Sequence, residues 1–99
     1  MRAVHLSDLN MAARTLLAVP DTGRRNLAHL LIKNAHLADK YRKKTGRAHP
    51  RYGDGSLCAV CLPLARTAMP DRCDPRYLEC LGIVIEGLLD SVTMKVCEH

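Results

Sequence analysis

Apolar residues recur at intervals of three and four over most of the chain, which is the spacing that places them on one face of an α-helix. The first such segment runs from about Ser7 to Val19, and we expect the Ser7 hydroxyl to cap it. Pro20 ends the segment, because its ring excludes the preceding residue from the helical conformation. The face expected to be buried comprises Leu6, Leu9, Ala13, Leu16 and Leu17.

A second and longer helix is predicted from about Thr22 to Thr45. Gly46 follows it at the position where a glycine commonly ends a helix in the left-handed conformation. The expected inner stripe consists of Leu27, Leu30, Leu31, Asn34, Leu37, Ala38 and Tyr41.

Residues 46–55 are predicted to form a loop, because Pro50, Gly53 and Gly55 prevent a continuous helix there. A short third helix is expected from about Ser56 to Thr67. Ser56 is its expected cap, and Pro63 is expected to interrupt or kink it. A second loop then covers residues 68–73.

A fourth helix begins with a strong signal, since Asp74 can cap it and Pro75 suits its first turn. Its apolar face is wider than a surface helix needs, so it is either the central helix of the domain, which we favour, or a seam for another subunit. The acidic residues Glu79, Glu86 and Asp90 lie on the opposite side. The two adjoining apolar stripes are Tyr77, Leu81, Val84, Leu88 and Val92, and Leu78, Ile85, Leu89 and Val96.

These segments predict an all-α protein, a compact bundle of about four helices in which the second and fourth are the longest. With 99 residues, 47% hydrophobic and 25% charged, the chain has the composition of one globular domain over residues 1–99 and not of a disordered protein. Trp and Phe are absent, which argues against nucleic-acid binding by aromatic stacking. We expect no signal peptide, no membrane span and a cytoplasmic location.

Positive charge is concentrated in the first 55 residues, which hold 11 Lys and Arg against 4 Asp and Glu, whereas the remaining residues hold 4 against 6. The cluster could bind the phosphate backbone of a nucleic acid or an acidic protein partner. It could equally be a solvated face whose cations compensate the dipole at a helix C-terminus. The candidate binding residues are Lys40, Arg42, Lys43, Lys44, Arg47, His49 and Arg51.

Five cysteines raise the question of zinc, because Cys58 and Cys61 have the C-x2-C spacing of a ligand pair. Only one such pair exists, and it lies in an apolar helical run, so we favour buried reduced thiols and no cofactor. The alternative function is a small zinc-stabilised domain acting as an adaptor or regulator. Its ligands would be Cys58, Cys61 and two of Cys73, Cys80 and Cys97, in the first instance Cys73 and Cys80.

Catalysis receives less support from the sequence, and we expect the protein not to be an enzyme. A cysteine nucleophile needs a nearby histidine, and Cys58 with His49 is the available pair, but no nucleophile motif surrounds them. The stretch from Gly53 to Ser56 lacks the Gly-Lys-Ser/Thr ending of a phosphate-binding loop.

Three parts of the chain carry a family resemblance: the opening Met-Arg-Ala-Val-His-Leu-Ser-Asp-Leu, the central residues 45–50 with residues 53–57, and Asp74-Pro75-Arg76-Tyr77. They resemble a family of short uncharacterised alphaproteobacterial helical proteins associated with gene-transfer-agent subunits of the small-terminase kind. The resemblance implies a helical oligomer that recruits a packaging ATPase and helps to present DNA. The chain lacks an evident N-terminal helix-turn-helix, so the resemblance implies no sequence-specific DNA reading.

Overall fold

The computed structural model describes residues 3–69, 71 and 73–97, with side chains through residue 92. It contains four α-helices and one short 3-10 helix, and the described residues include no strand. The second and fourth helices are the longest, at 22 and 23 residues, so the predicted all-α bundle is confirmed. The elements in chain order are α1 (Leu6–Leu17), η1 (Asp21–Gly23), α2 (Arg24–Thr45), α3 (Leu57–Cys61) and α4 (Pro75–Cys97).

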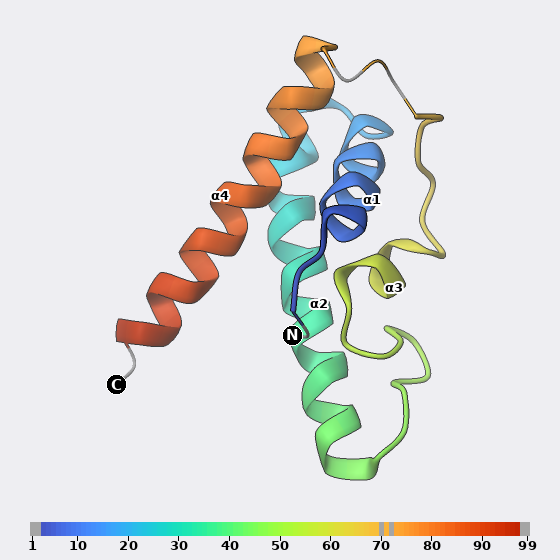
Figure 1. The fold of residues 1–99 in the computed structure, drawn as a ribbon, viewed down its shortest axis with the longest axis vertical. Coiled ribbons are helices and arrows are strands. Elements are labelled where there is room, and N and C mark those ends of the chain that lie inside the picture. The colour runs from blue at the N-terminus through green and yellow to red at the C-terminus, as the bar shows by residue number, and fades with distance from the viewer. Residues whose placement is uncertain (1–2, 70, 72, 98–99) are drawn as a thin grey trace.

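All four helices contribute to one core. Helix α1 packs against α3 and α4. Helix α2 packs along these three helices, and its C-terminal end extends beyond them (Figure 1). Helix α4 approaches α2 closely at Gly87, where an added Cβ would lie 2.9 Å from Cδ1 of Ile32. The core residues are Ala12, Ala13, Leu16, Ala28, Leu31, Ile32, Ala35, Leu57, Val60, Cys61, Tyr77, Cys80 and Val84.

The face of α2 that is buried differs from the predicted one. Leu30, Leu37 and Tyr41 were expected inside, but their exposed fractions are 50%, 45% and 36%. Alanines at positions 28 and 35 are buried instead, because their small side chains let the neighbouring helices come close. The buried residues of α2 are Ala28, Leu31, Ile32, Ala35, Ala38 and Asp39.

The ends of α1 and α3 also differ from prediction. Helix α1 begins at Leu6 with His5 as its N-cap, so Ser7 lies inside the helix and Leu6 is exposed. Helix α3 ends at Cys61 and not at Thr67. Pro63 explains the early end, since it has no N–H for the helical hydrogen bond and its ring would clash with the preceding turn.

Other local signals are confirmed. Ser56 Oγ accepts a hydrogen bond from Ala59 N at 3.1 Å, and Asp74 Oδ1 accepts one from Arg76 N at 2.9 Å. Gly46 ends α2 in the left-handed conformation with φ of +75°. These are contacts between near neighbours in the chain, which is why sequence alone could predict them.

The outer stripe of α4 is exposed in this structure. Tyr77 and Val84 are buried as expected, whereas Leu78, Ile85 and Leu89 face away from the core. Val92 is exposed as well, and Val96 lies outside the residues whose side chains are described. Among the described residues, no helix combines the length and the apolar composition needed to cross a membrane.

A buried carboxylate joins the beginnings of two helices. Asp8 Oδ2 accepts a hydrogen bond from His5 N at 2.8 Å, at the start of α1. Asp8 Oδ1 accepts one from Cys58 N at 2.9 Å, at the start of α3. Since the first N–H groups of a helix have no partner within it, one side chain satisfies donors from two helices separated by 50 residues in sequence.

Candidate anion-binding surface

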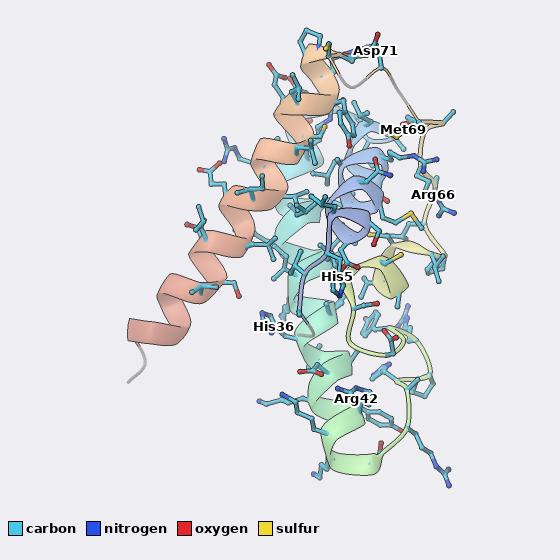
Figure 2. The ribbon with its side chains drawn as sticks, in the orientation of Figure 1. His5, His36, Arg42, Arg66, Met69 and Asp71 are labelled. Carbon is cyan, nitrogen blue, oxygen red and sulfur yellow. The ribbon has the colours of Figure 1, made fainter. Side chains whose placement is uncertain are left out.

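The end of α2 presents lysines to solvent around one buried acid. Lys40, Lys43 and Lys44 are exposed, and Arg42 is partly buried near the end of the helix (Figure 2). Lys43 Nζ lies 3.1 Å from Asp39 Oδ2, and the Arg42 guanidinium lies 3.2 Å from Asp39 Oδ1. Arg42 and Lys43 therefore pair with Asp39, and Lys40 and Lys44 are exposed at the same end of the helix.

Asp39 remains charged in this setting. Burial by itself raises the pKa of its carboxyl, but the hydrogen bonds from Lys43 and Arg42 are among the contacts that outweigh burial, and the pKa falls well below its usual range. Ionised Asp39 therefore stabilises the fold at pH values above the ordinary carboxyl pKa. This stabilisation is lost as the pH falls towards the lowered pKa of Asp39 in the folded protein.

The loop after α2 is held by hydrogen bonds between its own residues. His49 and Gly53 exchange both backbone hydrogen bonds, with N···O distances of 2.7 Å and 3.0 Å. Inside the loop, His49 Nδ1 accepts hydrogen bonds from Arg51 N at 3.0 Å and Tyr52 N at 3.1 Å. Because Nδ1 accepts, the neutral ring carries its hydrogen on Nε2.

Two tyrosines enclose the His49 ring. Its centroid lies 5.0 Å from that of Tyr41 in an edge-to-face arrangement and 4.9 Å from that of Tyr52 in a stacked one. The Arg51 guanidinium lies 5.9 Å from the Tyr52 ring centre, within range of a cation–π contact. Arg51 is thus an exposed cation on a hydrogen-bonded loop. His49 is half-buried, and its ring holds the loop backbone through the hydrogen bonds that it accepts.

The loop is also fixed to the side of α2. Asp54 Oδ1 accepts a hydrogen bond from Ser56 N at 3.0 Å, which forms a tight turn before α3. Gly55 has φ of +97° and lies so close to α2 that an added Cβ would be 2.8 Å from Asp39 Cβ. Asp39 therefore contacts both the cations of the helix end and the backbone of the returning loop.

A groove opens beside this loop. It has a volume of about 560 Å³ and lies between α2 and the segment from residue 50 to residue 64. Its lining is largely apolar, with Arg51 and Asn34 as the polar contributors. Leu27, Leu30, Leu64 and Tyr52 are among its walls, so several of the α2 residues expected in the core border this groove instead.

The structure thus groups the seven predicted residues into three kinds. Lys40, Lys44, Arg47 and Arg51 are exposed cations, Arg42 and Lys43 pair with the buried Asp39, and His49 orders the loop. Sequence analysis missed the contributions of Asp39, Tyr41 and Tyr52 to this surface. The signal for Asp39 was present in its spacing of three and four residues from Arg42 and Lys43, which is favourable for ion pairs on a helix.

The four cysteines whose side chains are described differ in burial, and Cys97, also a candidate ligand, lies outside the described side chains. Cys61 and Cys80 are buried in the core, Cys58 is half-buried and Cys73 is exposed. Within the described part of the chain, no group of three or more His, Cys, Asp or Glu side chains is arranged to hold a metal ion. The zinc alternative with Cys58, Cys61, Cys73 and Cys80 stays a prediction, which metal analysis of the purified protein tests.

Thiol reactivity is expected to follow burial. Burial raises the pKa of the Cys61 thiol to about 11, and it also raises the pKa of Cys80. A rise from the ordinary 9.0 lowers the thiolate fraction of Cys61 by about 100-fold at neutral pH. We expect iodoacetamide to modify Cys73 first in the native protein and to leave Cys61 and Cys80 intact, as read by peptide mass spectrometry.

Denatured protein supplies the control for this experiment, since all of its thiols should react at similar rates. Fast modification of Cys61 in the native state would contradict its burial. It would favour instead a reactive cysteine of the kind that an enzyme uses.

A family model described as a domain of unknown function, DUF7742, matches residues 2–88 of the chain. The match covers all four helices as far as Leu88 in α4, including the basic end of α2 and the loop that follows it. No curated protein and no solved structure showed significant similarity to the chain.

Proposed function

The chain belongs to the DUF7742 family of unknown function, and from its own residues we propose that it is a non-enzymatic helical module that binds the phosphate backbone of a nucleic acid. The observation that carries this proposal is the set of exposed cations on an ordered support, formed by Lys40 and Lys44 on α2 and by Arg47 and Arg51 on the loop. Several cations held at fixed positions can meet phosphates spaced along a duplex.

The surface offers charge without a means of reading bases. Helix α3 follows the loop, is five residues long and is mostly buried, so it cannot enter a major groove as a recognition helix. Binding would therefore depend little on sequence and strongly on salt. This fits the more specific proposal of a DNA-packaging subunit of the small-terminase kind, for which the support is the sequence resemblance together with this basic surface.

The proposal predicts the effect of removing two loop cations. Neutralising both Arg47 and Arg51 by substitution with glutamine should weaken binding to a short fluorescent DNA duplex by about 10-fold at low salt. The slope of log affinity against log salt should fall by roughly 2, because each lost phosphate contact removes about 0.9. Fluorescence anisotropy over a salt series measures both quantities.

A matched control removes the same charge elsewhere. Arg66 and Arg76 are exposed cations outside the α2 end and its loop, so changing both to glutamine should leave the slope almost unchanged. Equal losses in the two double variants would mean that only net charge matters. If the wild-type protein binds polyglutamate but no DNA, the basic surface serves an acidic protein partner instead.

A further inference from the structure

Helix α4 carries an apolar stripe that faces away from the protein core. Leu78, Ile85 and Leu89 have exposed fractions of 51%, 44% and 62%, and their spacing of seven and then four residues places them on one face. The residue after each of them is acidic and exposed. These acids are Glu79, Glu86 and Asp90.

Helix α2 carries a second exposed stripe with the same spacing. Leu30, Leu37 and Tyr41 are also separated by seven and then four residues, and all three are exposed. The third residue after each of them is an exposed lysine. These lysines are Lys33, Lys40 and Lys44.

The two stripes therefore match in apolar spacing and are opposite in charge. We propose that the α4 stripe of one copy of this chain packs on the α2 stripe of a second copy, with the acidic row of α4 against the lysine row of α2. A second copy is favoured as the occupant because the complementary charges and the shared spacing both come from this one sequence. The groove beside Leu30 provides space for apolar side chains at the edge of the contact.

Helix geometry fixes the relative direction of the two helices. Each residue advances about 100° around the axis, so the acids lie about 100° to one side of their stripe and the lysines about 60° to the other side of theirs. Side chains on opposite sides of two stripes face each other only when the two packed helices run in the same direction, as in parallel coiled coils. The contact is therefore parallel, with Glu79 facing Lys33 and Asp90 facing Lys44 of the second copy.

The contact joins different faces of the two copies. Helix α4 forms one edge of the molecule, and the segment between α2 and α4 forms the opposite edge, with α2 between them (Figure 1). A head-to-tail contact of this kind leaves one α4 stripe and one α2 stripe free in each pair, so further copies can add. The contact shares Lys40 and Lys44 with the proposed DNA-binding surface, but it uses neither Arg47 nor Arg51, the pair tested for DNA binding, and it forms without nucleic acid.

Charge reversal gives a specific test. One variant carries Glu79→Lys and Asp90→Lys, and the other carries Lys33→Glu and Lys44→Glu. We expect wild-type protein to associate as its concentration rises in sedimentation velocity, and each variant alone to remain near the 11.0 kDa of one chain. An equimolar mixture of the two variants should associate again, because each then offers the charge that the other lacks.

The double variants leave Glu86 unchanged, since it pairs with Arg25 at 2.7 Å within the same chain, and circular dichroism checks that both variants fold. A wild-type protein that stays monomeric at all concentrations would overturn the proposal. So would association of the Lys33→Glu, Lys44→Glu variant at the wild-type level, since that result would place α4 against α4. A monomer that still binds DNA would overturn this contact alone and leave the proposed function intact.

Discussion

Replacing Gly55 with alanine is expected to destabilise the fold by about 3 kcal/mol, from backbone strain and overpacking together. With φ of +97°, this residue adopts a conformation that side chains disfavour. The added Cβ would also lie 2.8 Å from Asp39 Cβ and 2.9 Å from Asp39 Cα. The second of these atoms belongs to the backbone of α2 and cannot rotate away, so either the loop or the helix must move. Urea denaturation followed by circular dichroism measures the loss.

Gly82 offers a matched glycine without these constraints. It lies within α4, and an added Cβ there would meet nothing within 4 Å. Gly82→Ala should therefore stabilise the protein by about 0.5–1 kcal/mol through its effect on helix propensity. If Gly55→Ala behaved in the same way as Gly82→Ala, the loop would not pack on Asp39 as described.

Replacing Asp8 with alanine is expected to have the second large effect, a loss of about 2–4 kcal/mol in the free energy of unfolding. The change removes the acceptor for His5 N at the start of α1 and for Cys58 N at the start of α3. It also removes a buried negative charge from the positive end of both helices. Asp8→Asn should lose less, because its carbonyl oxygen can still accept one of the two hydrogen bonds.

Ser7 provides the control, since it is the neighbouring residue that the sequence indicated as the cap. It is exposed and lies inside α1, so Ser7→Ala should change stability by less than about 0.5 kcal/mol. A loss with Ser7→Ala as large as that with Asp8→Ala would show that the serine caps α1 after all. Denaturant midpoints of the two variants decide between these results.

The sequence predicted those parts of the fold that depend on neighbours in the chain. Gly46 ends a helix by its backbone conformation, Ser56 caps one with its side chain and Pro75 suits a first turn, and the structure has them in these roles. The buried face of α2 could not be predicted in the same way. Leucines at positions 30 and 37 are more hydrophobic than the alanines, so a hydrophobic pattern places the leucines in the core. Only small residues fit, however, where helices approach closely.

The candidate site shows the same difference between features set by chain neighbours and features set by distant contacts. Its cations are evident in the sequence because they lie within twelve residues of one another. The order of the loop is not evident, since it depends on the rings of Tyr41 and Tyr52 on either side of His49 and on the approach of Gly55 to α2. Such contacts arise only when the loop folds back onto α2, and no local sequence pattern indicates them.

The hydrogen bond from Cys58 to Asp8 bears on the order in which the protein forms during synthesis. A ribosome that has released α1 has not yet made α3, and α4, against which α1 also packs, comes later still. Much of the buried face of α1 therefore stays uncovered until most of the chain has emerged. The long sequence separation of these contacts also implies slower folding than in a bundle built from adjacent helices.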